Sequence, residues 1–172
     1  MSRYDKIPRV NDDNEVIGET TITEAVENGW YRRISRVFLF DEQGRLLLQK
    51  RSSQMRSFPN LWDQSAAGHS DVGEEPVAAA KRELYEELGL GDLELKEIVD
   101  GFANSHGSEK TFDSVYIGLV DSNVSPKLDD QEVSETRWFT IDEFEMALAE
   151  NPTDFVPPFV NVWKNFKDRL LQ

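Results

Sequence analysis

The sequence predicts an α+β fold, a sandwich in which helices pack against a mixed β-sheet. Runs rich in β-branched and aromatic residues stand before and after one strongly patterned helical segment, residues 68–90. A second helical pattern closes the chain at residues 154–172. Because 172 residues are enough for one domain with its own core, we expect residues 1–172 to form a single domain.

The first part of the predicted sheet is read from turn signals between β-rich runs. Residues 10–18 contain two short strands around an Asp-Asp-Asn turn, and residues 23–28 form a short helical turn. Together they make residues 1–30 an N-terminal extension. A hairpin follows, with strands at 34–40 and 45–50 joined by a turn that contains a glycine.

The remaining strands surround the central helical segment. Residues 61–67 approach it in extended form. After it, strands are expected at 93–103 and 111–120, with a polar loop at 104–110 between them, and a last strand at 135–139. Strands on both sides of one helix favour a mixed sheet over a purely parallel one.

Two further helices are expected near the C-terminus. Thr140, or Asp142 after it, caps a short helix that ends near Asn151. In the last helix, apolar residues recur at helical spacing and would face a core: Phe159, Val160, Trp163, Phe166 and Leu170.

The central helical segment has clear ends and an apolar stripe. Pro76 suits the first turn, where its missing N–H would be unpaired anyway, and Gly89 suits the left-handed position just past the last turn. Between them, apolar residues recur at spacings of three and four: Val77, Ala80, Leu84 and Leu88. We expect the acids beside this stripe to stand at the margin between core and water.

Three of those acids, Glu83, Glu86 and Glu87, gather on one side of the helix because of their three- and four-residue spacings. Like charges so close repel by roughly 0.2–0.5 kcal/mol per pair on an isolated helix. The cluster therefore needs open solvent or a cation, and Mg²⁺ or Mn²⁺ suits such hard oxygen ligands. Arg82, four residues before Glu86, can neutralise part of the charge.

Composition excludes several classes of protein. The chain has 33 acids against 19 bases, a net charge of −14, so polymeric nucleic acid is a poor candidate partner. There is no cysteine, which excludes disulfides, thiolate chemistry and Cys-based zinc sites. No apolar run approaches the roughly 20 residues that cross a membrane, and no secretory leader is recognisable. We therefore expect no membrane partner and a cytoplasmic location.

The segment GHSDVGEEPVAAAKRELYEELGL, residues 68–90, resembles a complete Nudix box. It has a glycine, a glutamate six positions later, and then Arg-Glu-apolar-x-Glu-Glu-x-Gly-apolar. The resemblance implies an α/β/α sandwich with a loop–helix–loop catalytic motif. It also implies a hydrolase of small molecules in which a nucleoside diphosphate is linked to another group, with Mg²⁺ or Mn²⁺ as cofactor. Such a metal can neutralise phosphate charge and activate water.

The resemblance also implies roles for individual residues. The metal ligands would come from Glu83, Glu86, Glu87, Glu74 and the backbone carbonyl of Ala67. Within this set, Glu83 would be a ligand or the base that activates water, and Glu74 would support the metal shell. Arg82 would orient the glutamates through salt bridges, so that Arg82, Glu83 and Glu86 are the expected catalytic residues.

Segments outside the box resemble type 1 isopentenyl-diphosphate isomerases and their hydrolase-like relatives. They are VNDDNEVIG, RVFLFDEQGRLLLQKRS and FPNLWDQSAAGH. In those isomerases a catalytic cysteine stands two residues before the histidine of a Cys-Gly-His motif, and here Ala67 takes that place. Histidine ligands are also expected near the first core strand, where residues 30–33 contain none. Without a thiol the isomerase mechanism lacks its acid, so a hydrolase is the better interpretation.

Several other residues are candidates for substrate contacts. Lys50, Arg51 and Arg56 could meet substrate phosphates, although solvated surface charge explains them equally well. Trp62 could stack on a base or belong to the core, and His69 could face the metal or substrate or be a loop histidine bound to backbone. Nudix enzymes often add an acid from outside the box, and the candidates here are Glu109 and Asp113.

Three functions are consistent with these observations. The first is a metal-dependent hydrolase that cleaves the pyrophosphate bond of a nucleoside diphosphate derivative or a related small diphosphate. The second is an isomerase of the isoprenoid type, which the missing cysteine disfavours. The third is a non-catalytic Nudix-fold binding or regulatory module, which the retained acids disfavour.

Overall fold

The computed structural model describes residues 6–172, so the first five residues of the predicted extension lie outside the described part. A seven-stranded sheet forms the centre, in the order β5-β4-β3-β8-β7, with β6 paired to β3 and β9 to β4. Its strands are β3 (Arg32–Phe40), β4 (Leu46–Arg51), β5 (Trp62–Asp63), β6 (Ala66–His69), β7 (Leu95–His106), β8 (Glu109–Leu119) and β9 (Val133–Phe139). Because β3 and β8 are parallel while their neighbours pair antiparallel, the predicted mixed sheet is confirmed.

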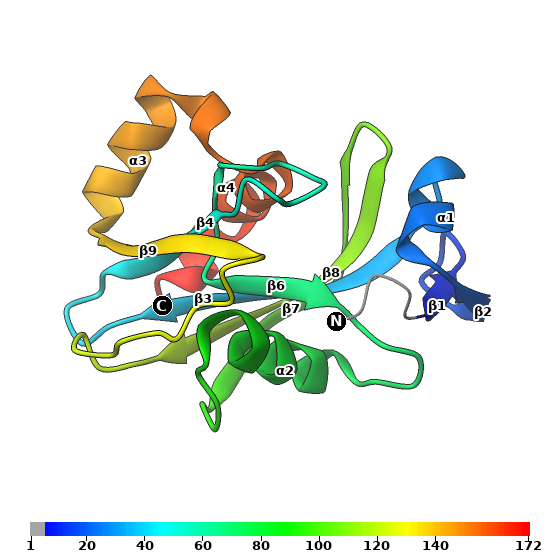
Figure 1. The fold of residues 1–172 in the computed structure, drawn as a ribbon, viewed down its shortest axis with the longest axis horizontal. Coiled ribbons are helices and arrows are strands. Elements are labelled where there is room, and N and C mark those ends of the chain that lie inside the picture. The colour runs from blue at the N-terminus through cyan, green and yellow to red at the C-terminus, as the bar shows by residue number, and fades with distance from the viewer. Residues whose placement is uncertain (1–5) are drawn as a thin grey trace.

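Helices lie on both faces of this sheet (Figure 1). They are α1 (Ile22–Glu27), α2 (Pro76–Leu88), α3 (Ile141–Glu150) and α4 (Pro157–Leu170), with a 3₁₀ turn, η1, at Pro152–Asp154. A small hairpin of β1 (Ile7–Val10) and β2 (Val16–Thr20) stands beside α1 at one end of the molecule. The predicted sandwich is therefore confirmed, and the extension adds a hairpin and a short helix to it.

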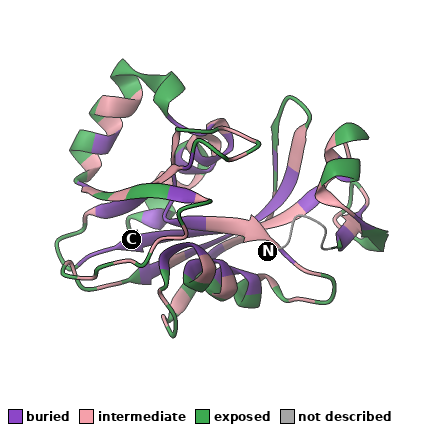
Figure 2. Cartoon of the chain, viewed as in Figure 1, coloured by how far each residue is buried: buried purple, intermediate pink, exposed green. Residues whose placement is uncertain are grey.

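Alternation along β3 explains why both faces are covered. Phe38 and Phe40 belong to a core cluster with α4, whereas Val37 and Leu39 belong to a second cluster with α2. Successive side chains of a strand point to opposite faces, so one strand supplies both cores. Figure 2 shows the consequence for α2, which is buried along its inner side and exposed along its outer side.

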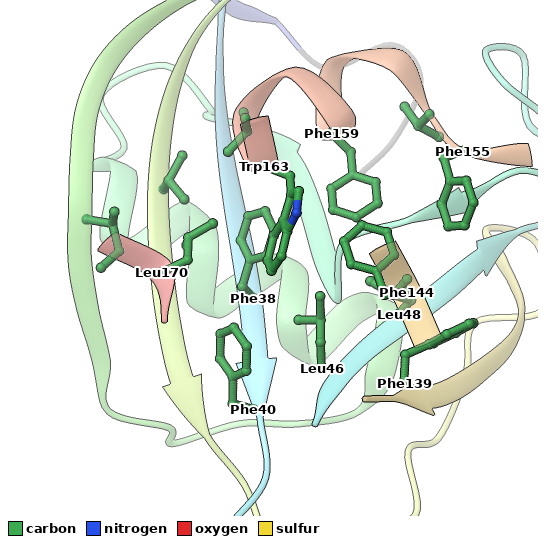
Figure 3. Packing of buried hydrophobic residues seen from close by; sticks show 14 residues of the cluster. Phe38, Phe40, Leu46, Leu48, Phe139, Phe144, Phe155, Phe159, Trp163 and Leu170 are labelled. Atoms are coloured by element: carbon green, nitrogen blue, oxygen red, sulfur yellow. The ribbon is translucent and has the colours of Figure 1, made fainter. Parts of the chain in front are cut away.

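The core on the α4 side is rich in aromatic rings (Figure 3). The Phe144 ring of α3 stacks on the Phe159 ring of α4 with centroids 5.5 Å apart, and Trp163 meets Phe144 edge-on at 5.0 Å. Such geometries are the favourable ones for aromatic pairs. The predicted core residues of the last helix are confirmed, with Phe159, Trp163 and Leu170 buried and two others partly buried: Val160 and Phe166.

The predicted polar loop at 104–110 is wrong. β7 continues to His106 and β8 begins at Glu109, so these residues form the end of a long hairpin. The polar residues of this segment pair across the two strands, with Asn104 opposite Thr111. Gly107 adopts the left-handed conformation of the turn, with φ 61°. Figure 1 shows this end of the hairpin standing away from the sheet toward α1.

The predicted extended segment 61–67 is divided into β5 and β6. Between β5 and β6, the segment passes the point where β3 and β4 separate. There the Ser65 side chain forms hydrogen bonds with both strands. Its hydroxyl donates to the Leu47 carbonyl at 2.6 Å and accepts from the Leu39 N–H at 2.8 Å. One side chain thus replaces two missing ladder bonds, and the chain moves from β4 to pair with β3.

The last two helices begin as their caps require. Thr140, not Asp142, caps α3 through a reciprocal capping box with Glu143. α4 begins at Pro157 instead of residue 154, because η1 comes first. Within residues 6–172, none of the helices combines the length and the apolar character that a membrane span requires. The cytoplasmic location stays a prediction.

Candidate active site

α2 begins and ends as its sequence predicts. Pro76 lies in the first turn, and Gly89 adopts the left-handed conformation after the last turn, with φ 66°. The Gly89 N–H donates to the Tyr85 carbonyl at 2.9 Å, and the Leu90 N–H donates to the Leu84 carbonyl at 3.2 Å. A Cβ on Gly89 would also approach Lys127 to 2.9 Å. The orientation of the acidic helix is therefore held at its C-terminal end.

The buried face of α2 differs from the predicted stripe. Ala80, Leu84 and Leu88 are buried, but Val77 is 39% exposed. Glu83 and Glu87, at 4% exposure each, lie on the buried face instead. The expected position at the margin between core and water is therefore wrong for these two acids. The reason is that Ala79, Glu83 and Glu87 stand four residues apart on one side of the helix, and Ala79 is buried as well.

Gly68 of β6 makes room for the first of these acids. A Cβ at this position would lie 1.9 Å from Glu83 Cδ and 2.0 Å from Glu83 Oε1. The glycine is therefore needed for close approach and not for an unusual backbone angle. β6 pairs Gly68 with Ser35 of β3, so the sheet fixes the backbone against which the carboxylate lies.

Arg82 connects the acids to the preceding loop. Its guanidinium binds Glu74 with two bonds, from Nε to Oε1 at 3.0 Å and from Nη2 to Oε2 at 2.9 Å. Nη1 donates to Glu83 at 2.6 Å and to Glu86 at 3.2 Å, and Nη2 also donates to the His69 carbonyl at 2.8 Å. Glu74 in turn accepts from the Asp71 N–H at 2.9 Å. This geometry is that of a group that orients carboxylates.

Burial changes the acidity of the two inner carboxyl groups. Burial raises the pKa of Glu83 to about 7, against the opposing effect of Arg82. Burial also raises the pKa of Glu87, and the charges of Glu83 and Glu132 raise it further. Ionisation of both carboxyl groups at such buried positions costs free energy, because the charges lose their hydration and repel each other. A nearby cation would offset that cost.

Glu87 has neutral partners on two strands. The Gln49 side chain of β4 donates to Glu87 Oε2 at 2.7 Å, and the Ala67 N–H of β6 donates to the same oxygen at 3.4 Å. The Ala67 carbonyl, a predicted metal ligand, belongs to the neighbouring peptide unit. Sequence reasoning missed Gln49, because a glutamine in a buried strand carries no pattern of its own.

Glu132 is an acid near this site that sequence reasoning did not find. The loop before β9 is tied to the end of α2, with Lys127 N–H donating to the Leu88 carbonyl at 2.8 Å and Asp129 N–H to the Glu87 carbonyl at 3.1 Å. This places Glu132 in the same cavity as Glu83 and Glu87. Its pKa is raised, mainly by burial. The Glu132 carbonyl also accepts from the Ser52 N–H at 2.8 Å, so tertiary backbone bonds bring this residue, distant in sequence, to the helix.

The buried acids open on a cavity of about 560 Å³. This volume is typical of sites for small molecules. The cavity is also lined by arginines from three segments: Arg32 and Arg36 of β3, Arg51 of β4, and Arg56 of the following loop. Acids that could hold a cation and guanidinium groups that could meet phosphate therefore share one space.

His69 lines this cavity and lies next to the guanidinium group of Arg32. Its Nε2 is 3.1 Å from Arg32 Nη1, and Arg32 also pairs with Glu109. Burial, and then the charge of Arg32, lowers the pKa of His69 to about 3. The imidazole is therefore neutral at neutral pH and accepts from the guanidinium. Arg32 and Glu109 both line the cavity, so the structure brings this predicted acid to it.

The remaining candidates are placed differently. Arg51 lines the cavity and donates to the Ser57 carbonyl at 3.0 Å and to Asp63 at 3.3 Å. Asp113 is fully buried and is not part of the cavity lining, and it accepts from Arg36 at 2.7 Å. Two others lie outside the cavity lining: Lys50, which pairs with Glu135 at 3.6 Å, and Trp62, which packs edge-on against Phe139 at 5.4 Å.

The donor set suits a divalent ion, although its members are not yet gathered around one point. Among residues 6–172, no three carboxyl or imidazole groups are already arranged as a metal site. Glu83 is turned to Arg82 and Glu87 to Gln49. Carboxylate and carbonyl oxygens are nevertheless the ligands that Mg²⁺ and Mn²⁺ prefer, and the raised pKa values of the acids favour a compensating cation.

The chain is similar in sequence and in fold to known proteins. The sequence profile of the NUDIX domain matches residues 30–159. An isopentenyl-diphosphate Delta-isomerase of Serratia proteamaculans is 33% identical over 91% of this chain and 88% of its own length. An uncharacterized Nudix hydrolase of Listeria monocytogenes is 34% identical over 87% of both chains. The crystal structure of DR0079 from Deinococcus radiodurans superposes with a TM-score of 0.74 at 26% identity, covering 85% of this chain and 90% of that one.

The contact at Gly68 generates a first prediction. Gly68→Ala should push the Glu83 carboxylate out of its position and weaken Mn²⁺ binding on the order of 10-fold, the usual lower limit when the support of a ligand is lost. Isothermal titration with Mn²⁺ measures this. Gly91→Ala is the matched control, because its Cβ would meet only Tyr85 at 3.6 Å. Equal Mn²⁺ affinity in Gly68→Ala and wild type would contradict the assignment of Glu83.

The raised pKa values generate a second prediction. Between about pH 4.5 and 7, the unfolded chain releases the Glu83 proton while the folded chain keeps it, so the metal-free fold loses stability as pH rises. Glu87 behaves in the same direction. Glu87→Gln should therefore gain thermal stability over wild type as pH rises through this range. His69 has the opposite pH dependence, but it is common to both proteins and cancels in the difference.

Melting curves in EDTA across this pH range measure that difference. Glu75→Gln is the control, since Glu75 is the exposed N-cap residue just before the same helix and makes no capping bond with its side chain. A difference between Glu87→Gln and wild type that does not change with pH would show that the acids are not strained in the folded protein.

Proposed function

Because this chain belongs to the Nudix family, we propose that it is a metal-dependent hydrolase of a pyrophosphate bond. The substrate would be a nucleoside diphosphate derivative or a related small diphosphate. The observation that carries the proposal is the pair of buried carboxyl groups, Glu83 and Glu87, at a cavity that also contains arginine side chains. A bond between two phosphates needs both a cation for its charge and donors for its outer oxygens.

The proposal gives a role to each of the predicted metal ligands and to Arg82. Glu83, Glu86, Glu87 and the Ala67 carbonyl would hold Mg²⁺ or Mn²⁺, with Glu74 supporting them. When bound, such an ion would neutralise phosphate charge and lower the pKa of a bound water. Arg82 would keep Glu83 and Glu86 in position through the bonds it already makes.

Glu83 has two alternative roles. A carboxyl group with a pKa of about 7 can accept a proton from water near neutral pH, which is what a general base must do. The same group could instead be a metal ligand. Either role can use Glu83 Oε2, because the Arg82 contact occupies Oε1.

Phosphate contacts are proposed for the arginines of the cavity. Arg51 is the predicted residue best supported, since it lines the cavity together with Glu83 and Glu87. His69 is neutral and could orient Arg32 toward an anion. Lys50 and Trp62 stay predictions with less support, because both lie outside the lining.

Substitution of the acids tests the proposal. Glu83→Gln, Glu86→Gln and Glu87→Gln should each lower kcat on the order of 10²-fold, about 2.7 kcal/mol in the activation barrier. Gln keeps the shape but removes the negative charge. A screen of nucleotide sugars, dinucleoside polyphosphates, nucleoside di- and triphosphates and prenyl diphosphates identifies the substrate, and phosphate release then gives kcat.

Two controls make this screen decisive. Glu75→Gln changes the exposed N-cap acid just before the same helix and should keep wild-type kcat. EDTA should abolish turnover in wild type, and Mg²⁺ should restore it. Near wild-type rates in all three acid variants, with normal melting, would place the reaction elsewhere. Binding of a compound without turnover in Mg²⁺ or Mn²⁺ would favour the non-catalytic module.

A second candidate function is favoured by the relatives that carry the name isopentenyl-diphosphate Delta-isomerase. Two features of this chain oppose it. Ala67 has no ionisable side chain where the resemblance implies a cysteine. Arg32 places a guanidinium 3.1 Å from His69, which disfavours a second metal ion at that imidazole by charge repulsion.

Isomerisation is tested directly by proton NMR. Isopentenyl diphosphate incubated with the protein and Mg²⁺ in D₂O should gain no deuterium and form no dimethylallyl isomer, because no thiol is present to deliver the proton. Ala67→Cys provides a comparison that restores only the thiol. Deuterium incorporation by the wild-type protein at a catalytic rate would overturn the hydrolase proposal in favour of the isomerase.

A further inference from the structure

Arg36 is the cavity arginine that stands beside the proposed metal ligands. The antiparallel pairing of β3 and β6 sets Arg36 opposite Ala67, whose carbonyl is one of those ligands. Paired residues of neighbouring strands have their side chains on the same face, with Cβ atoms about 4.5–5.5 Å apart. Both residues line the cavity, and the methyl group of Ala67 leaves space for the guanidinium. A phosphate held by a cation at this carbonyl would therefore come close to Arg36.

A buried carboxylate fixes one side of the Arg36 guanidinium. Nε donates to Asp113 Oδ2 of β8 at 2.7 Å, and Nη1 donates to Gln64 Oε1 at 3.3 Å. Arg36 is 4% exposed and Asp113 is fully buried. Among residues 6–172, no side chain or carbonyl accepts a hydrogen bond from Nη2, yet this nitrogen is not enclosed by the protein. Nη2 is therefore free to donate to an anion in the cavity.

Two asparagines hold the carboxylate in turn. Asn104 Nδ2 of β7 donates to the same oxygen of Asp113 at 2.7 Å and to the Pro158 carbonyl at 3.0 Å. Asn161 Nδ2 of α4 donates to Asn104 Oδ1 at 2.7 Å. The bonds thus run without a break from α4 through β7 and β8 to Arg36. The guanidinium is fixed by elements that lie outside the acidic helix.

Stability of the fold does not account for this network. A buried ion pair is often no more stabilising than apolar side chains of similar volume, because both charges lose their hydration. In the described part of the chain, Asp113 Oδ1 and Gln64 Nε2 are also buried without a hydrogen-bond partner, which adds a desolvation cost. A cation that is held rigidly and has one N–H free suits ligand binding, since little order is lost when the ligand arrives.

We propose that Arg36 Nη2 binds a phosphate oxygen of the substrate, and that Asp113 and Asn104 are positioning residues that hold the guanidinium for this contact. The inference rests on the proposed function, because it takes the diphosphate to lie between the acids of α2 and β3. It also gives Asp113 a role other than that of an extra acid for the metal. Its Oδ2 already accepts from both Arg36 and Asn104, so this carboxylate serves an arginine.

Binding of methylenebisphosphonate, a diphosphate analogue that cannot be hydrolysed, tests the contact without turnover. Affinity is measured by calorimetry in Mg²⁺. Arg36→Met combined with Asp113→Leu removes both charges, so no unpaired charge stays in the interior and the melting temperature should be kept. This double variant should bind the analogue on the order of 10- to 100-fold more weakly than wild type, as expected for loss of a hydrogen bond from a charged group. Lys6→Met combined with Glu19→Leu removes an exposed ion pair of the N-terminal extension and should leave the affinity unchanged.

Single variants test positioning. Asn104→Leu keeps both charges but removes one donor to Asp113, and should weaken binding about 3-fold. Asp113→Asn keeps the cation but loosens it, and Arg36→Lys keeps the charge without the fork of N–H groups, so each should weaken binding on the order of 10-fold. With the substrate that the screen identifies, KM should rise more than kcat falls, because an outer phosphate oxygen is held alike before and during cleavage. If Asp113→Asn does not fold, Asn104→Leu and the double variant still decide.

Each outcome bears on the inference. Equal affinity of the Arg36→Met, Asp113→Leu variant and wild type for methylenebisphosphonate would overturn the phosphate contact. Lower melting temperatures with unchanged affinity in the single variants would show that the network has only a structural role. The expected losses of affinity together with no cleavage of any diphosphate would refute the hydrolase while the anion site stands, and cleavage with equal affinities would do the reverse. Failure of the wild-type protein to bind the analogue in Mg²⁺ would overturn both.

Discussion

The ion pairs of Arg82 are the interaction on which the rest of the site depends. One guanidinium binds Glu74 from the loop, Glu83 and Glu86 from α2, and the carbonyl of His69 from β6. Within residues 6–172, no other cation forms an ion pair with the buried Glu83, and removal of one partner of a buried ion pair costs about 3–5 kcal/mol. Arg82 therefore lets an acidic helix pack its carboxylates against a sheet, and it joins the loop, the helix and the strand into one unit.

The sheet supplies the space into which these acids point. β4 and β6 both pair with β3 but diverge from each other, and Ser65 satisfies the backbone groups at the point of divergence. β6 then presents Gly68, the position without a side chain, to Glu83. On the other side, β4 presents Gln49 to Glu87. A cavity with acids at its base is thus a consequence of how two strands separate along a third.

Charge and shape divide the cavity into parts with different chemistry. Acids from α2 and the loop before β9 lie near arginines from β3 and β4, while α1, the loop at 52–60 and the start of α4 contribute apolar side chains. The relatives include proteins named as isomerases and proteins named as hydrolases. This chain differs from the isomerase pattern at Ala67 and near Arg32, both of which line the cavity. Any difference in function between this chain and those relatives would therefore arise in the lining, since the surrounding frame is shared.

The local sequence determined α2, because Pro76 and Gly89 act on their own backbone and the acids have helical spacing. It also determined the mixed sheet and the aromatic face of the last helix. Tertiary structure alone decided that Glu83 and Glu87 are buried, since the rotation of α2 depends on how the helix packs on β6 and β3. It alone brought Glu132 to Glu87 and Arg32 to His69, and it extended β7 and β8 through a polar segment. These contacts join residues far apart in the chain, and their energy depends on partners that no local pattern specifies.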